Sequence, residues 1–141
     1  MTGSKSEFRA LRELLGITQQ TLADDLDVKP LSVKRWESPK YPQQAPADAW
    51  ELLDSLEADQ ANACAAALAK ASQRPQEPTG QAHAVEVPYW SSAADYEASR
   101  SSAEITWTEA NATSRRLAAI LMDRGESVAW VDGATCTDPL L

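Results

Sequence analysis

Two adjacent cations, Lys34 and Arg35, lie in a short segment that is predicted to form a helix beginning at Pro30. Val33 and Trp36 recur in this segment at the spacing of a buried helical face, so the two cations fall on the exposed side. Arginine and lysine there can donate hydrogen bonds to guanine O6 and N7 in a DNA major groove, which admits one helix. On an arbitrary helix the same cations would be an ordinary solvated surface. The residues around Lys34 and Arg35 in the sequence are therefore needed to distinguish DNA contact from an ordinary solvated surface.

A second predicted helix precedes this one and can hold it in place. Thr18 is a suitable N-cap for a helix from Gln19 to Leu26, and Asp27 lies in the turn that follows. The pattern predicts a helix-turn-helix within residues 6–37, with Trp36 in its core. The apolar contacts between the two helices are expected from Leu22, Ala23, Val28, Val33 and Trp36.

Two further helices are predicted around this pair. The first follows Ser6 as N-cap, ends at Gly16 and carries Phe8, Leu11, Leu14 and Leu15 at helical spacing. Prolines 39, 42 and 46 then predict a loop. The second starts at Ala47, and an alanine-rich pattern continues through Ala71. This helix either continues through that run or is followed by another helix, in which case we expect the break near Glu57 to Gln60.

The remainder of the chain predicts a small second domain. Residues 73–84 have the composition of a linker, and the tail 133–141 is expected to be flexible. Between them we expect a strand at 85–89, a helix at 93–99, a helix at 108–124 and a strand at 127–131. The predicted fold is mainly α: a helix-turn-helix bundle of four or five helices (1–72) plus a small C-terminal α+β unit with two short strands (85–132).

Apolar residues in this second domain fit a core. Tyr89, Trp90 and Tyr96 could form the aromatic wall of a ligand pocket, but a domain this small also needs large side chains for its core, which we favour. Helical spacing links a further set of residues into one wide stripe, namely Trp107, Ala110, Ser114, Leu117, Ala118, Ile120 and Leu121.

Charge is distributed unevenly along the 141 residues. The formal net charge is −8, yet residues 1–45 hold seven basic and six acidic side chains, whereas the other 96 residues hold six and fifteen. Phosphate contacts need lysine and arginine. A DNA-facing surface is therefore expected only in the first third of the chain, and the acidic remainder should limit non-specific binding.

Several function classes have little support. The two cysteines are far apart and the single histidine, His83, lies in the predicted linker, so we expect no metal site and no cofactor. Acidic residues are scattered and no glycine-rich loop follows a strand, so we expect no catalytic residues and no enzymatic activity. The sequence contains neither a membrane-length apolar run nor the apolar middle of a signal peptide. We expect a soluble, cytoplasmic protein.

Residues 6–56 resemble the Cro/C1 class of helix-turn-helix regulators. Gln19, Ala23, Val28, Ser32, Val33, Trp36 and Glu37 fall in register with that pattern. Asp27 replaces the usual turn glycine, which is a mild change because Asp tolerates the left-handed conformation. Ser38 and Pro39 replace the usual Asn-Gly, which implies a different exit loop.

This resemblance implies a set of DNA contacts. Gln19 would contact a phosphate, assisted by free N–H groups at the start of its helix, although it could instead only cap that helix. Lys29 and Ser32 would also touch the backbone, and Lys40 would extend that footprint. Leu31, Lys34 and Arg35 would face base edges, where an apolar side chain suits a thymine methyl group.

The C-terminal part resembles the small anti-CRISPR-associated autorepressors of bacteria. The resemblance rests on the order of VEVPYW, SAADYEA, ITWTEANATSRRLAAILMDRG and SVAWV. It implies that the C-terminal domain pairs two protomers, so the chain would be a homodimeric repressor that binds an inverted repeat in double-stranded DNA. The alternative is an antitoxin-like interaction module whose acidic C-terminal part masks a protein partner. Lys34 and Arg35 favour the repressor, because a masking protein has no need of cations there.

Overall fold

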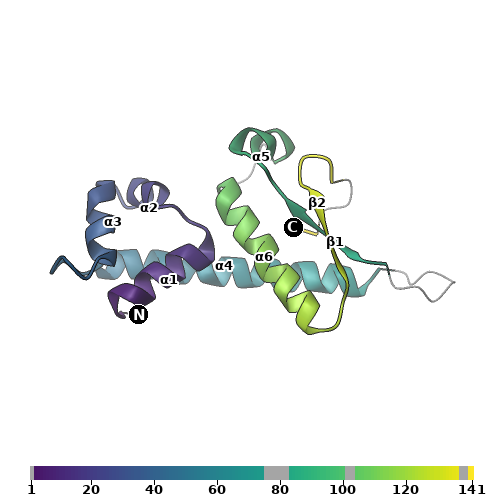
Figure 1. The fold of residues 1–141 in the computed structure, drawn as a ribbon, viewed down its shortest axis with the longest axis horizontal. Coiled ribbons are helices and arrows are strands. Elements are labelled where there is room, and N and C mark those ends of the chain that lie inside the picture. Colours follow the sequence, from purple (N-terminus) through teal and green to yellow (C-terminus); the bar gives the residue numbers. More distant parts are fainter. Residues whose placement is uncertain (1, 75–82, 101–103, 137–139) are drawn as a thin grey trace. The chain divides into compact units, whose positions relative to one another are not determined.

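A computed structural model describes residues 2–74, 83–100, 104–136 and 140–141 of the chain. The described chain is mainly helical and has one two-stranded parallel sheet in its C-terminal part, as predicted (Figure 1). Its contacts divide it into two compact units, Met1–Gln60 and Ala61–Leu141. The elements are α1 (Lys5–Leu15), α2 (Gln19–Asp25), α3 (Pro30–Glu37), α4 (Ala47–Ser72), β1 (Val85–Tyr89), α5 (Ala93–Ser99), α6 (Trp107–Asp123) and β2 (Val128–Asp132).

Helix α1 begins two residues earlier than the sequence analysis predicted. Its N-cap is Ser4 rather than Ser6, because Ser4 forms a reciprocal capping box in which its hydroxyl accepts from the backbone N–H of Glu7. The Glu7 side chain in turn accepts from the backbone N–H of Ser4. The helix ends at Gly16, which has a left-handed φ of 73°. The predicted end is thus confirmed and the predicted start is wrong.

The turn between α2 and α3 has the predicted chemistry. Thr18 caps α2 by accepting from the N–H of Thr21, and Pro30 is the first residue of α3. Asp27 has a φ of 53°, the left-handed conformation that the turn requires in place of the usual glycine. The N–H of Val28 donates to the carbonyl oxygen of Ala23 at 2.9 Å and closes the turn.

The core of the N-terminal unit is built around three aromatic rings. The ring of Phe8 on α1 makes edge-to-face contacts with Trp36 and Trp50, at centroid distances of 6.1 and 5.1 Å. Trp36 is only 8% exposed, as predicted for a core residue. Leu14, in contrast, is 62% exposed, so its predicted place on the buried stripe of α1 is wrong. The other buried apolar residues of this core are Leu15, Ile17, Leu22, Ala23, Val33, Ala49 and Leu53.

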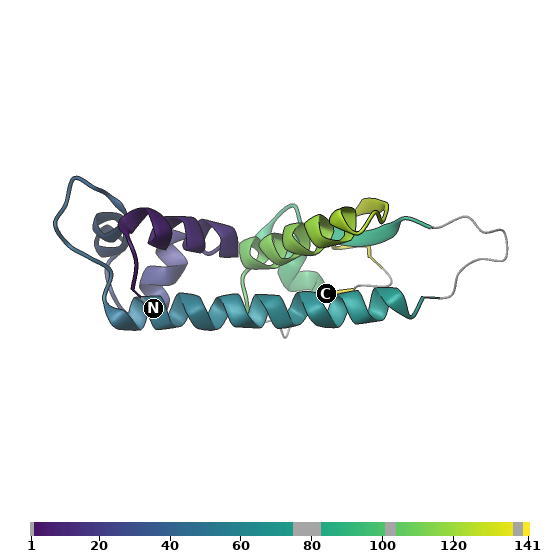
Figure 2. The same cartoon turned by 90° about the horizontal axis from the view of Figure 1, so that it is seen from below.

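Helix α4 is one uninterrupted helix of 26 residues, so of the two predicted alternatives the continuous helix is confirmed and the break near Glu57 to Gln60 is wrong (Figure 2). The sequence there contains no proline or glycine that would end a helix, and the alanine-rich run that follows has high helix propensity. The division between the two units falls within this helix, between Gln60 and Ala61.

The C-terminal unit pairs β1 with β2 in parallel, with Val85 opposite Val128 and Tyr89 opposite Asp132. A parallel pair needs a long crossover connection, which α5 and α6 provide. Apolar residues from β1, α6 and the second half of α4 form the main core of this unit. They are Cys64, Ala67, Val85, Val87, Leu117, Ala118 and Leu121, joined by Leu140.

Helix α6 and a smaller aromatic cluster complete the C-terminal unit. Trp90 and Tyr96 are buried with their rings 5.0 Å apart, which fits the core interpretation of these two residues. For Tyr89 the core interpretation is wrong, because it is the last residue of β1 and is 39% exposed. The predicted stripe of α6 is also confirmed: its members are buried, except Trp107 and Ile120, which are half-buried. Asn111 binds both backbone groups of Trp90, accepting from its N–H and donating to its carbonyl oxygen, each at 2.9 Å.

The predicted linker and tail are described only in part. Residues 75–82 of the linker and 137–139 of the tail lie outside the described residues. Leu140 is buried against the main core of the C-terminal unit, so this residue does not belong to a free tail.

Candidate nucleic-acid interface

Helix α3 has two faces of opposite character. Val33, Trp36 and Glu37 are buried, whereas Lys34 is exposed and Leu31 is 48% exposed. Leu31, Lys34 and Arg35 share one side, because three and four residues correspond to about one helical turn. We call these three residues the exposed face of α3. An apolar and two cationic side chains on one exposed surface match the chemistry of base edges in a major groove.

Arg35 is only half-buried rather than fully exposed, so the predicted exposure of both cations is confirmed for Lys34 and only in part for Arg35. Its guanidinium carbon lies 5.6 Å from the centroid of the Tyr41 ring, within cation–π distance. Its Nε is enclosed and has no hydrogen-bond partner among the described residues. The two terminal Nη groups are therefore the donors that Arg35 can direct outward.

The remaining predicted contact residues surround the exposed face. Lys29 is the exposed N-cap residue of α3 and makes no side-chain cap, while Ser32 is half-buried in the first turn. Lys40 is exposed in the loop of residues 38–46, which we call the exit loop. Six of the predicted contact residues thus lie near α3. Three form its exposed face, and the other three are Ser32 in α3, Lys29 at its N-cap and Lys40 in the exit loop.

Gln19 differs from the other six predicted residues, because it makes an internal contact. It is half-buried, and its Nε2 donates to Oε2 of Glu37 at 2.8 Å. An amide nitrogen carries two hydrogens, so one donor remains. A phosphate contact by Gln19 stays a prediction, and its hydrogen bond to Glu37 links the start of α2 to the end of α3.

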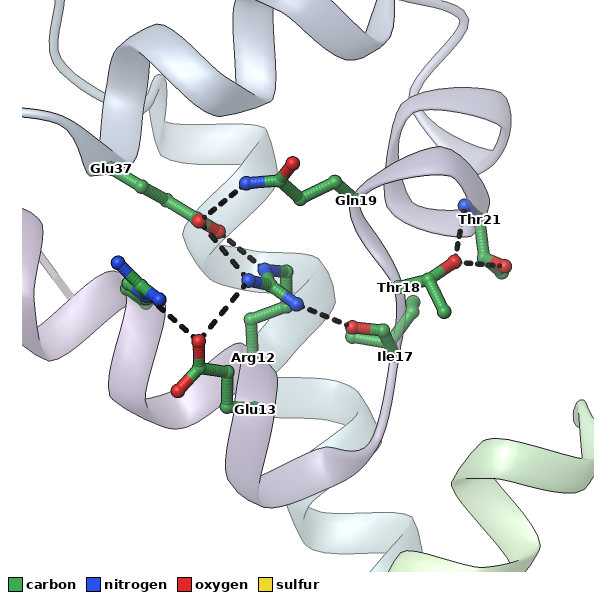
Figure 3. A network of polar contacts seen from close by, with 8 residues as sticks. Arg12, Glu13, Ile17, Thr18, Gln19, Thr21 and Glu37 are labelled. Carbon is green, nitrogen blue, oxygen red and sulfur yellow. Dashed lines mark hydrogen bonds and ion pairs between the residues drawn. The ribbon is translucent and has the colours of Figure 1, made fainter.

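A buried ion pair fixes α1 against α3 (Figure 3). Arg12 donates to both carboxylate oxygens of Glu37, through Nε to Oε1 and through Nη2 to Oε2 at 3.0 Å. Arg12 also donates through Nη1 to the carbonyl oxygen of Ile17 at 2.9 Å. Only 10% of the Arg12 side chain and 4% of the Glu37 side chain are exposed. The bidentate geometry restricts the angle at which α3 presents its exposed face.

Lys5 ties the end of α3 to the exit loop. Its ammonium group donates to the carbonyl oxygen of Arg35 at 2.7 Å and to the carbonyl oxygen of Gln43. Lys5 is therefore used for internal structure and is only half exposed.

The sequence analysis missed Arg12, Lys5 and Tyr41. Arg12 could have been found, because it lies four residues after Phe8 and three before Leu15, on the buried stripe of α1. A cation at such a position requires a buried anion. Lys5 and Tyr41 had no comparable pattern, since their partners are set by the path of the exit loop.

Few groups in the described residues have a shifted pKa, and each shift has a local cause. The hydrogen bond from Arg9 lowers the pKa of the exposed Glu13 carboxyl. Burial raises the pKa of the Cys64 thiol and of the Tyr96 hydroxyl. Each of these shifts is thus explained by the immediate surroundings of one side chain on α1, α4 or α5.

Comparison of the chain with models of known protein families and with curated proteins gives no match. Within the described ranges, no group of three or more histidine, cysteine, aspartate and glutamate side chains could hold a metal ion. Across the same part of the chain, every helix is too short or too polar to cross a membrane.

Proposed function

We propose that this chain is a sequence-specific DNA-binding transcription regulator, a homodimeric repressor that binds an inverted repeat. The observation that carries the proposal is the exposed face of α3. Leu31, Lys34 and Arg35 lie together on this face, and the opposite face is fixed in the core by Trp36 and by the ion pair of Glu37. A helix held at a fixed angle, with cations on its free side, is what docking in a major groove requires.

The surroundings of α3 support specific rather than general DNA binding. Lys29 and Lys40 flank the exposed face and can contact phosphates. Asp24, Asp25 and Asp27 are exposed just before α3 and repel phosphates. The electrostatic attraction is thus weak, so base contacts must supply more of the affinity.

The homodimer is supported by apolar surface on the C-terminal unit. Trp130 is 49% exposed and Tyr89 is 39% exposed, and their rings lie 5.6 Å apart in an edge-to-face arrangement. A two-stranded sheet is marginal alone, and exposed aromatic residues are enriched at protein interfaces. A second copy of this unit would cover both rings. A two-fold dimer would then present two α3 helices to half-sites about 34 Å apart, or a multiple of that.

Selection of bound fragments from random DNA by the full-length protein tests the proposal. We expect enrichment of a palindromic sequence. Lys34→Ala and Arg35→Ala should each weaken binding to the selected site by about 1 to 3 kcal/mol if the replaced side chain makes a bidentate base contact. Thermal melting should be unchanged. No enriched sequence, or equal affinity of the double variant and the wild type, would overturn the DNA-binding function.

Sedimentation of a Trp130→Ser variant tests the dimer separately. The wild type should be dimeric at micromolar concentration, and the variant should dissociate and bind the full site much more weakly than the wild type does. Met122→Ser is the control, because Met122 is also an exposed apolar residue, 54% exposed on α6. A monomeric wild type, or a Trp130→Ser variant that remains dimeric, would contradict this interface.

A further inference from the structure

Tyr41 lies in the exit loop, outside α3, yet it contacts the side chain of Arg35. The guanidinium carbon is 5.6 Å from the ring centroid, and Tyr41 is 39% exposed. The Nε of this guanidinium is buried and has no hydrogen-bond partner within the described residues. The Tyr41 ring lies next to the charged end of Arg35 and can hold it.

The exit loop that carries Tyr41 is itself held at several points. The N–H of Tyr41 donates to the carbonyl oxygen of Ser38 at 3.3 Å, and the N–H of Lys40 donates to the Ser38 hydroxyl at 3.4 Å. Lys5 donates to the carbonyl oxygens of Arg35 and Gln43, which precede and follow Tyr41 in the chain. The backbone thus fixes Tyr41 relative to the last turn of α3.

The consequence for Arg35 follows from the geometry of the guanidinium group. Arginine stacks on aromatic faces while its Nη edge stays free to donate, and a held guanidinium loses less freedom when it forms a bidentate contact. The edge that remains free is the one that fits guanine O6 and N7.

We infer that Tyr41 is a positioning residue that orients Arg35 toward one base pair of each half-site, so that the base preference at this position depends on the Tyr41 ring. This inference rests on the proposed DNA-binding function. The ring of Tyr41 is sufficient for this role, and its hydroxyl is not needed.

Two substitutions at this position separate the ring from the hydroxyl. Tyr41→Phe keeps the aromatic face and removes the hydroxyl, whereas Tyr41→Leu keeps an apolar side chain and removes the aromatic face. Since Tyr41 is partly exposed, both variants should fold, and their melting temperatures check this. Affinities of the full-length proteins are then measured for the selected site and for every single-base variant of one half-site.

We expect Tyr41→Leu to weaken binding about two- to fivefold, which corresponds to the loss of one partly exposed cation–π contact. The weakening should be confined to one base position, the one at which Arg35→Ala abolishes the preference. The preference assigned to Lys34 should be unchanged, because the contact described for Tyr41 is with Arg35. Tyr41→Phe should behave as the wild type, and Tyr41→Leu should have no added effect in an Arg35→Ala background.

Three results would overturn the inference while leaving the proposed function intact. One is an unchanged base preference of Tyr41→Leu at every position. Another is equal weakening by Tyr41→Phe and Tyr41→Leu on all sites, which would show a phosphate contact by the hydroxyl. The third is an effect of Tyr41→Leu that persists in full in the Arg35→Ala background. If the wild type selects no sequence at all, the proposed function fails and the inference fails with it.

Discussion

The two units of this chain each bury polar groups, and the pair of contacts that joins elements of each unit differs in kind. In the N-terminal unit a buried ion pair, Arg12 with Glu37, joins α1 to α3. In the C-terminal unit the best-connected buried group is the neutral amide of Asn111, which binds both backbone groups of Trp90. Loss of an amide leaves two backbone groups unpaired, whereas loss of one charge leaves the other charge buried without compensation.

The buried ion pair and the buried amide are therefore expected to serve different purposes, orientation of α3 in one unit and stability in the other. A buried ion pair is weak evidence for stability, since well-packed apolar residues often replace it at no cost. The Arg12–Glu37 pair has one bidentate geometry, and it joins two helices whose relative angle determines where the exposed face of α3 points. We therefore attribute to this pair the orientation of α3 more than the stability of the unit.

The largest expected effect comes from removing one charge of the pair. Glu37→Gln keeps the size of the side chain but removes the buried negative charge, so that the buried charge of Arg12 keeps only the exposed carboxylate of Glu13 nearby. We expect a loss of about 3 to 5 kcal/mol in the free energy of unfolding, measured by urea denaturation of the full chain. Hydrogen exchange should accelerate most in α1, α2 and α3.

Two controls make this test specific. Glu13→Gln is the same chemical change at a carboxylate that also lies near Arg12, at 3.7 Å, but is 51% exposed. It removes the exposed ion pair with Arg9, so its denaturation midpoint should fall only slightly, because exposed ion pairs contribute little to stability. The double variant Arg12→Met/Glu37→Leu should recover most of the stability, because no charge remains buried. If Glu37→Gln unfolds at the wild-type midpoint, the contrast between the two units does not hold.

A smaller loss is expected from the amide of the C-terminal unit. Asn111→Ala removes two hydrogen bonds and leaves the N–H and carbonyl groups of Trp90 unpaired, which should cost about 2 to 3 kcal/mol. Here hydrogen exchange should accelerate in β1 and α6. The matched control is Asn62→Ala, which changes an exposed asparagine on α4 and should leave the midpoint almost unchanged. Equal midpoints for the two asparagine variants would show that the Trp90 contacts contribute nothing.

Local signals in the sequence were sufficient for most elements and for the position of Trp36. Proline at the start of α3, the threonine cap of α2 and the spacing of apolar residues in α6 each act within a few residues. The pattern left open whether α4 is one helix or two, because its apolar residues alone do not decide this, although no proline or glycine there ends a helix.

Contacts between residues that are far apart in the sequence could not be predicted in the same way. Arg12 and Glu37 are 25 residues apart, and periodicity shows that each position is buried without showing which partner it meets. Tyr41 was missed because only the path of the exit loop brings it to Arg35. Six of the seven predicted DNA-contact residues lie on or next to α3, whereas Gln19 is joined to Glu37.

The smallest expected effect concerns the backbone, at one left-handed residue from each unit. Asp27 in the N-terminal unit and Gly125 in the C-terminal unit both have left-handed φ angles, 53° and 79°. This conformation is costly for a residue with a Cβ and free of that cost for glycine, although glycine loses more entropy on folding. Asp27→Gly should therefore stabilise the chain by about 0.5 to 1 kcal/mol, and Gly125→Asp should destabilise it by a similar amount.

Comparison of Asp27→Gly with Gly125→Asp measures the free-energy cost of the left-handed conformation itself. A Cβ at position 125 would have no neighbouring atom within 4 Å, so a loss of stability in Gly125→Asp cannot come from a steric clash with the surrounding protein. Asp25→Gly supplies the control for Asp27→Gly, because it removes an exposed carboxylate two residues away, from the helical end of α2. That control should lose stability, since glycine disfavours a helix. Stabilisation by both glycine variants would mean that relief of charge repulsion, rather than the left-handed backbone of Asp27, accounts for the gain.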